Sequence, residues 1–313
     1  MSIIEKSGIG CHVGTMFVGI LAYADDIVLL APTSRAMRRM LALCDKYADE
    51  FSILFNAKKS KCLIIKPYGT KTKMSSESNP LFYVGGSEIE IVDHWPHLGH
   101  IISKNCDDKD DIMNRRNCLV GQINNVLSYF GNLNSVTKYK LLASYCSSLY
   151  GCEIWRLDHS NINDVCVAWR KGLRRVWNLP ADTHCELLPL ICDTIPLFDV
   201  ICSRAIMFIN SCLNSTCPIV NYISRFGVYY GRMLSPIGQN AHTCCVRYGV
   251  STPSMCGSLN TCIIKRHFQS RVSDSTRSVV NLLLELLFIK QGSFYTGLST
   301  DEIDELIAHL CRF

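Results

Sequence analysis

Two adjacent carboxylates, Asp25 and Asp26, lie in the middle of an apolar segment that spans residues 19–31. Residues that favour β-structure stand on both sides of them, so the segment predicts a β-hairpin with both acids at its tip and both arms in a core. Unpaired carboxylates are costly to bury, and at the tip they need water, cations or a metal. Two acids on a rigid hairpin form half of a site for Mg²⁺, which prefers carboxylate oxygens and substrate phosphates. Asp also suits ordinary turns, so the pair alone does not distinguish a metal site from a turn.

The four residues Tyr23-Ala24-Asp25-Asp26 between two apolar strands form a more specific pattern. They resemble the catalytic hairpin of reverse transcriptases, and the Ala at the second position is similar to the non-LTR retrotransposon branch (LINE-type, jockey-like). The resemblance implies an RNA-directed DNA polymerase with an RNA template, a DNA primer, and Mg²⁺ or Mn²⁺ as cofactor. It also implies that Asp25 binds the catalytic metals, that Asp26 supports it, and that Tyr23 and Ala24 adjoin the nucleotide.

The elements that follow the hairpin have to hold it in place. Thr33 or Ser34 is predicted to cap a helix whose apolar residues keep helical spacing as far as Phe51. Residues 51–65 then predict a strand, a basic turn and a second strand. Residues 67–80 predict an exposed loop.

The basic turn allows two interpretations. Lysines in a turn can meet a triphosphate or a nucleic-acid backbone, but they are most often only solvated. An Asn followed by a lysine-rich run, one helix after the Asp pair, resembles the last palm motif of LINE-type reverse transcriptases. That resemblance implies that Asn56 and Lys59 contact the incoming nucleotide.

Three histidines at positions 94, 97 and 100 suggest a metal site, but a spacing of three on a strand places neighbouring side chains on opposite faces. Zinc needs ligands that converge on one point, so we do not expect a metal there. The segment 97–102 instead resembles the primer-grip hairpin of the same family. His97, Leu98 and Gly99 are then expected to hold the nucleic acid, and the glycine would let the primer backbone approach closely.

From residue 107 the pattern is helical. A second helix is predicted to be capped by Ser135, and further helices are predicted over 183–192, 197–214 and 275–290, with a short one near 301–312. Acids at 107, 108, 110 and 111 are expected at a helix N-terminus, where the helix dipole favours negative charge, rather than in a metal site. A later helix, from about Ser160 to Trp177, carries four cations without an intervening acid. With tryptophans between them, these cations form either a nucleic-acid surface or a solvated basic face: Arg170, Lys171, Arg174 and Arg175.

Composition narrows the class of protein. Of 313 residues, 48% are hydrophobic and 19% charged, which is typical of a globular protein and argues against disorder, while a net charge of +5 permits a polyanionic partner. The 18 cysteines are scattered and no signal peptide precedes them, so we expect reduced, mostly buried thiols in an intracellular protein of the cytoplasm or nucleus. No apolar run is long enough to span a membrane. A zinc site is weakly suggested by Cys244, Cys245, Cys256, Cys262 and His267, whose spacing fits no compact motif.

We therefore predict an α+β fold in three parts. Residues 1–105 form a partial palm, 106–215 a helical thumb and its extension, and 216–313 a helical region of unknown role. The resemblance implies that the fingers, the rest of the palm and an upstream endonuclease region are missing. Only one acid, Glu5, precedes Asp25, so the third carboxylate that two-metal catalysis needs is absent. We expect an incomplete palm with an exposed apolar edge and no polymerase activity from the chain alone. The alternatives are a non-enzymatic nucleic-acid-binding remnant and a decayed reading frame.

Overall fold

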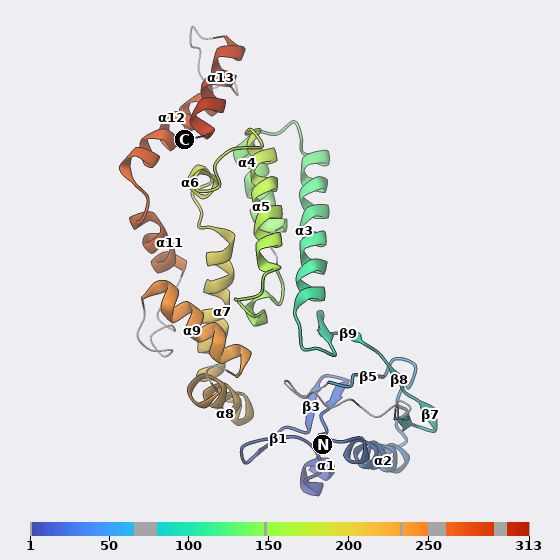
Figure 1. The fold of residues 1–313 in the computed structure, drawn as a ribbon. Coiled ribbons are helices and arrows are strands. Elements are labelled where there is room, and N and C mark those ends of the chain that lie inside the picture. The colour runs from blue at the N-terminus through green and yellow to red at the C-terminus, as the bar shows by residue number, and fades with distance from the viewer. Residues whose placement is uncertain are drawn as a thin grey trace. The chain divides into compact units, whose positions relative to one another are not determined.

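The computed structural model describes residues 2–65, 80–146, 149–231, 234–249, 261–290 and 299–312 (Figure 1). The chain packs as two compact units. Unit 1 contains residues 1–107 with 215–223, and unit 2 contains residues 108–214 with 224–313. The mixture of helices with small sheets confirms the α+β class, whereas the palm and thumb assignments remain predictions.

Unit 1 combines one long helix with very short strands. Its elements are α1 (Ser2–Ser7), β1 (His12–Val13), β2 (Met16–Phe17), β3 (Ile20–Tyr23), β4 (Asp26–Leu29), α2 (Ser34–Phe51), β5 (Lys61–Cys62), β6 (Tyr83–Val84), β7 (Ser87–Glu88), β8 (Glu90–Ile91), β9 (His94–His97) and β10 (His100–Ser103). Each described sheet has two strands. The pairs β1–β2, β3–β4, β6–β7 and β9–β10 are antiparallel, and β5–β8 is parallel.

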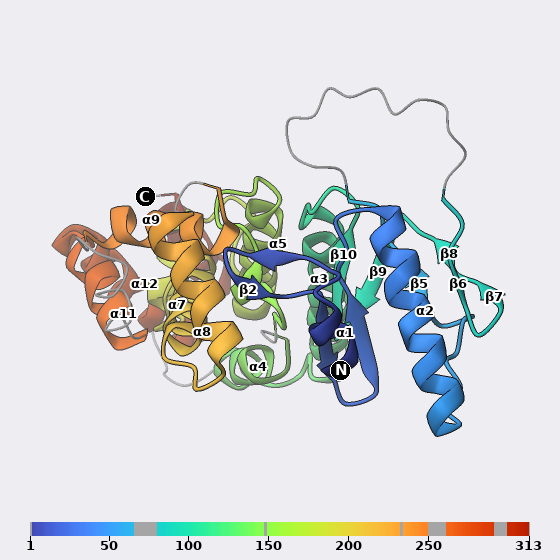
Figure 2. The same ribbon diagram turned by 90° about the horizontal axis from the view of Figure 1, so that it is seen from below.

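Helix α2 begins as predicted, because the Thr33 side chain accepts a hydrogen bond from the Ala36 amide at 3.1 Å. Figure 2 shows α2 beside the short strands, and it contacts β6. The cluster of buried side chains packed together in this unit is small: Leu41, Phe82, Val84 and Ile89.

The prediction of a strand that starts at Phe51 is wrong. Helix α2 continues to that residue, where the Phe51 ring packs on Tyr47 with centroids 4.4 Å apart, and it ends at Ser52 with a left-handed φ of 52°. Leu54 beyond it is 97% exposed, so its apolar character reflects no burial. The predicted loop at 67–80 lies almost entirely outside the described residues.

Unit 2 is helical and contains the larger core. Its α-helices are α3 (Lys109–Tyr129), α4 (Ser135–Leu141), α5 (Ile162–Trp177), α6 (Leu187–Ile191), α7 (Leu197–Leu213), α9 (Pro236–Tyr248), α11 (Thr261–Ser270), α12 (Asp274–Lys290) and α13 (Thr300–Cys311). Helix α8 (Pro218–Arg225) is divided between the two units, π-helical turns cover Leu142–Cys146 and Phe226–Tyr230, and a 3₁₀ turn covers Cys152–Ile154.

Close packing of α3 on α5 organises this core. A Cβ atom on Gly172 of α5 would lie 2.7 Å from the Ile123 Cδ1 atom of α3, so a larger residue would require the buried Ile123 side chain to shift. The predicted helices over 197–214, 275–290 and 301–312 are confirmed, that over 183–192 shortens to α6, and α8, α9 and α11 were not predicted. The predicted cap Ser135 is wrong, because the Asn134 side chain accepts the bond from the Thr137 amide.

Many of the described cysteines are buried, as predicted: Cys146, Cys152, Cys166, Cys192, Cys202, Cys244, Cys245 and Cys311. Burial raises the pKa of the Cys152 and Cys192 thiols to about 12 and that of the Cys166 thiol to about 11. Among the described helices, none combines the length and apolarity that crossing a membrane requires.

Candidate active-site hairpin and basic helix

Strands β3 and β4 form the predicted hairpin. Tyr23 pairs with Asp26 across a two-residue loop made of Ala24 and Asp25, so Asp25 lies in the loop and Asp26 begins β4. Ala24 has φ 52°, in the left-handed region that favours glycine, and the strain falls next to the two acids.

Two glycines and an aromatic ring support the base of the hairpin. The Leu30 amide donates to the Gly19 carbonyl at 2.8 Å and extends the ladder beyond β3 and β4. A Cβ atom on Gly19 would lie 2.5 Å from the Phe17 ring, and one on Gly10 would lie 2.9 Å from both that ring and the Gly19 Cα atom. The Phe17 ring therefore packs directly on the backbone of the two glycines, and a side chain at either position would displace the ring.

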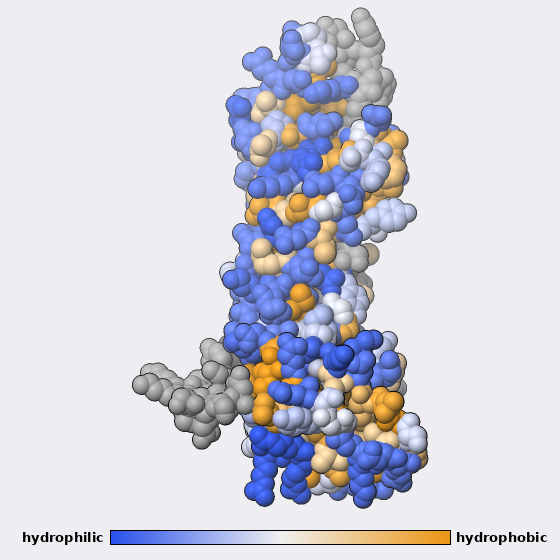
Figure 3. All heavy atoms as spheres, turned by 90° about the vertical axis from the view of Figure 1, so that its right-hand side faces the viewer, coloured by the Kyte–Doolittle hydropathy of each residue, from blue (hydrophilic) through white to orange (hydrophobic). Residues whose placement is uncertain are grey.

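The prediction that both arms are buried is wrong. Leu21, Tyr23 and Ile27 are 41%, 67% and 45% exposed. The reason is that β3 and β4 pair only with each other in the described structure, so no further strand covers them. These apolar side chains are therefore exposed on a two-stranded sheet, while its assignment to a palm remains a prediction. On the face of the molecule drawn in Figure 3, too, apolar side chains reach the surface among hydrophilic ones.

The two carboxylates fit half of a metal site. Asp25 and Asp26 are exposed, and neither carboxylate has a hydrogen-bond or ion-pair partner among the described residues. Their oxygens suit Mg²⁺ or Mn²⁺. Within the described ranges, however, no three His, Cys, Asp or Glu side chains come together as a metal site, which applies equally to the histidines near residue 97 and to the suggested zinc ligands. Cys256 lies outside those ranges.

The basic turn uses Asn56 as a structural residue. The Asn56 Oδ1 atom accepts a hydrogen bond from the Lys59 amide at 3.1 Å, and the Ser60 hydroxyl donates to the Asn56 carbonyl at 3.0 Å. The Lys59 side chain remains exposed. No hydrogen bond or ion pair joins this turn to Asp25 or Asp26 in the part of the chain that the structure describes.

The hairpin predicted at 97–102 is formed by β9 and β10, with Leu98 and Gly99 in the loop. Both loop residues have positive φ, 48° and 79°, as type I′ hairpin turns require. His97 pairs directly with His100, so these two share a face. The expectation of opposite faces is wrong for this pair, because the chain reverses between them.

The basic helix is α5, but its tryptophans are not available for stacking. Trp169 and Trp177 are only 6% and 4% exposed and belong to the core. The prediction that tryptophans alternate with the cations on the surface of this helix is therefore wrong.

The four cations of α5 also differ in their surroundings. Arg174 donates to the Thr183 carbonyl from Nε and Nη2, at 3.2 and 2.6 Å, and Arg175 donates to Asn124 Oδ1 at 2.6 Å. Arg170 is half-buried and Lys171 is exposed, and neither has a hydrogen-bond or ion-pair partner among the described residues. Within the described ranges, Arg170 and Lys171 are thus the two of the four cations whose side chains form no hydrogen bond or ion pair.

Sequence reasoning missed the functions of two acids at the start of α3. Asp111 is completely buried and accepts from the Trp155 indole Nε1 at 2.8 Å, while Asp108 accepts from the Arg156 amide at 2.8 Å. The available signal was Trp155 itself, because a buried indole N–H requires an acceptor.

The comparisons with known proteins concern part of the chain. It is 35% identical over 81 residues to the Pol polyprotein of the type-1 retrotransposable element R2 of Popillia japonica, and 31% identical over 93 residues to that of Nasonia vitripennis. It is 36% identical over 98 residues to the Pol polyprotein of the type-2 element R2DM of Drosophila melanogaster. The matches cover 25%, 29% and 30% of this chain, but only 17%, 9% and 9% of those proteins. Neither a family model nor a solved structure matches. The matched part of the chain is therefore related to retrotransposon Pol polyproteins.

Proposed function

We propose that the chain is a piece of a retrotransposon reverse transcriptase, an RNA-directed DNA polymerase. The observation that carries the proposal is the sequence Tyr23-Ala24-Asp25-Asp26 on a tight hairpin with both carboxylates exposed. The relatives, all described as Pol polyproteins of retrotransposable elements, support it.

In the complete polymerase, Asp25 would hold the divalent metal and Asp26 would support it. When bound, the metal would activate the primer 3′-hydroxyl and neutralise the charge of the triphosphate. Lys59, an exposed cation on its turn, would meet the phosphates of the incoming nucleotide, and the Leu98–Gly99 turn would hold the primer backbone.

Alone, the chain is proposed to be inactive. Two-metal nucleotidyl transfer needs a further carboxylate, and no third acid joins Asp25 and Asp26 among the described residues. The purified chain should therefore extend no primer on an RNA template with Mg²⁺ or Mn²⁺, and the Asp25→Ala, Asp26→Ala variant should behave identically. Extension that is lost on this double substitution would refute inactivity.

The same substitutions test the parent enzyme. If the transcript encodes further residues upstream of Met1, the longer polypeptide should extend primers, and Asp25→Ala should abolish this. Extension that survives Asp25→Ala would remove Asp25 from the catalytic site.

A second candidate, non-enzymatic nucleic-acid binding, is favoured by Arg170 and Lys171 of α5, which form no hydrogen bond or ion pair with any residue that the structure describes. It predicts salt-dependent RNA binding that is weakened when Arg170 and Lys171 are changed to Glu and that ignores Asp25→Ala. Binding that is unaffected by these charge reversals would exclude α5 as the surface.

A further inference from the structure

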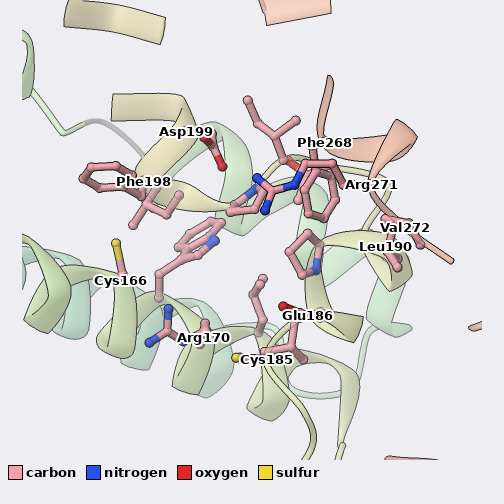
Figure 4. Close-up of a pocket in the computed structure, with 18 of the residues that line it drawn as sticks. Cys166, Arg170, Cys185, Glu186, Leu190, Phe198, Asp199, Phe268, Arg271 and Val272 are labelled. Carbon is pink, nitrogen blue, oxygen red and sulfur yellow. The ribbon is translucent and has the colours of Figure 1, made fainter. Parts of the chain in front are cut away.

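A pocket of about 420 Å³ lies within unit 2, between α5, the start of α7 and the end of α11. Figure 4 shows Cys166 and Arg170 on one side of it and Phe268 and Arg271 on the other. This volume is within the range of small-molecule sites in proteins.

Arg170 supplies a positive charge that the protein does not neutralise. Its guanidinium is half-buried in the pocket wall, without a hydrogen-bond or ion-pair partner in the described ranges. The nearby Arg174 has a lowered pKa, first because it is desolvated and then because of the charge of Arg170. A half-buried cation beside a second cation is costly unless an anion joins it.

The acids of the pocket do not provide that anion. The Asp199 carboxylate is buried and already accepts from Arg247 Nε and the Tyr248 hydroxyl, each at 2.7 Å. Glu186 is exposed and forms no ion pair with Arg170 in the described structure. Two cations that line the pocket, Arg170 and the exposed Arg271, therefore have no ion-pair partner among the described residues.

The remaining wall is apolar and aromatic. Trp169, Phe198 and Phe268 line the pocket, and the Arg247 guanidinium lies 4.9 Å from the centre of the Phe198 ring. Aromatic and guanidinium planes of this kind stack on nucleobases, while a free arginine binds phosphate.

We propose that this pocket binds a nucleoside monophosphate, with the phosphate on Arg170 and the base against the aromatic wall. The proposal uses no residue of the hairpin that carries Asp25 and Asp26, so it stands or falls separately from polymerase activity.

Calorimetric titration of the full chain with AMP, UMP, inorganic phosphate and adenosine tests this. AMP or UMP should bind saturably, with Kd below about 1 mM, and phosphate and adenosine at least about tenfold more weakly. No saturable binding by either nucleotide would overturn the proposal. If phosphate binds as tightly as AMP, the base does not contribute to recognition. If adenosine binds as tightly as AMP, the pocket has no site for the phosphate.

Variants locate the site. Arg170→Gln should weaken AMP binding at least about tenfold, and Arg271→Gln should weaken it as well. Arg266→Gln is the matched control, because Arg266 is an exposed cation on α11 that does not line the pocket. Equal losses in the pocket variants and the control would overturn the assignment. Circular dichroism shows whether each variant is folded, and if Arg170→Gln is not, Arg271→Gln decides the question.

Discussion

The indole Nε1 of Trp155 donates to the Asp111 carboxylate at 2.8 Å, and both side chains are completely shielded from solvent. The same segment is held from α9, where Asn240 donates to the Trp155 carbonyl at 2.7 Å and accepts from the Leu157 amide at 2.9 Å. Residues 155–157 belong to no helix or strand, and side chains far away in the sequence supply their hydrogen bonds instead.

Asp111→Ala should destabilise the protein by about 1–3 kcal/mol, because it leaves a buried indole N–H without this acceptor. The comparison is Asp110→Ala, which removes the exposed neighbouring acid and should change stability by less than about 0.5 kcal/mol. Urea unfolding followed by tryptophan fluorescence measures both. Similar values for the two variants would contradict the importance of the buried bond.

Replacing glycine by alanine should raise the stability of the protein in α3 and lower it in α5. At Gly121 of α3 no atom lies within 4 Å of an added Cβ, so alanine should stabilise by up to about 1 kcal/mol through helix propensity. At Gly172 of α5 the Cβ would meet the buried Ile123 side chain at 2.7 Å, and overpacking should cost about 1–3 kcal/mol. Thermal unfolding of both variants checks the signs, and stabilisation at both positions would show that the helices can separate freely.

Ala24→Gly should stabilise the candidate catalytic hairpin by up to about 1 kcal/mol, because glycine adopts the observed φ of 52° without strain. Hydrogen exchange of the Leu30 amide, which is bonded to Gly19, should become about fivefold slower. Ala42→Gly in α2 is the control and should not slow this exchange. Unchanged exchange in Ala24→Gly would mean that the turn stores no strain.

Stability should fall as pH rises above about 9. Thiols in the unfolded chain ionise near their ordinary pKa of 9.0, whereas in the folded protein Cys152 and Cys192 keep their protons up to about 12. Over this interval the unfolded state binds fewer protons, so each thiol lowers the free energy of unfolding by up to about 1.4 kcal/mol per pH unit.

Urea unfolding between pH 8 and 10 measures this slope. Cys192→Ala should reduce the slope, and Cys118→Ala, which removes an exposed thiol, should leave it unchanged. The test compares how steeply the free energy of unfolding changes with pH. If Cys192→Ala also loses packing, its free energy of unfolding falls by the same amount at every pH, so the slope is not affected. Identical slopes in both variants would exclude the buried thiol as their source.

The sequence predicted local structure where local chemistry decides it. Thr33 caps α2, the Asp pair sits at a hairpin, and Leu98–Gly99 turns a second hairpin, because cap and turn propensities act over a few residues. The helices α7, α12 and α13 were predicted as segments bounded by Gly, Pro and Ser breaks, and the structure has helices there.

Burial was harder to predict, because it depends on what packs against an element. The arms of the Asp hairpin have apolar sequences, but no further strand pairs with them among the described residues, and Leu54 is apolar yet exposed. Conversely, Asp111 is charged but buried, since Trp155 supplies a donor 44 residues away. The basic residues of α5 share one helix in the sequence, but Arg174 and Arg175 are bound to partners that spacing could not reveal.

The far end of α13 is fastened to residues near α6. The His184 amide donates to the Cys311 carbonyl at 2.8 Å, and Arg312 forms an ion pair with Asp182 at 2.9 Å. A fluorescent protein or affinity tag joined directly after α13 would therefore begin next to a packed helix end. A flexible spacer there should preserve both contacts, and purification tags for the experiments above are best separated by one.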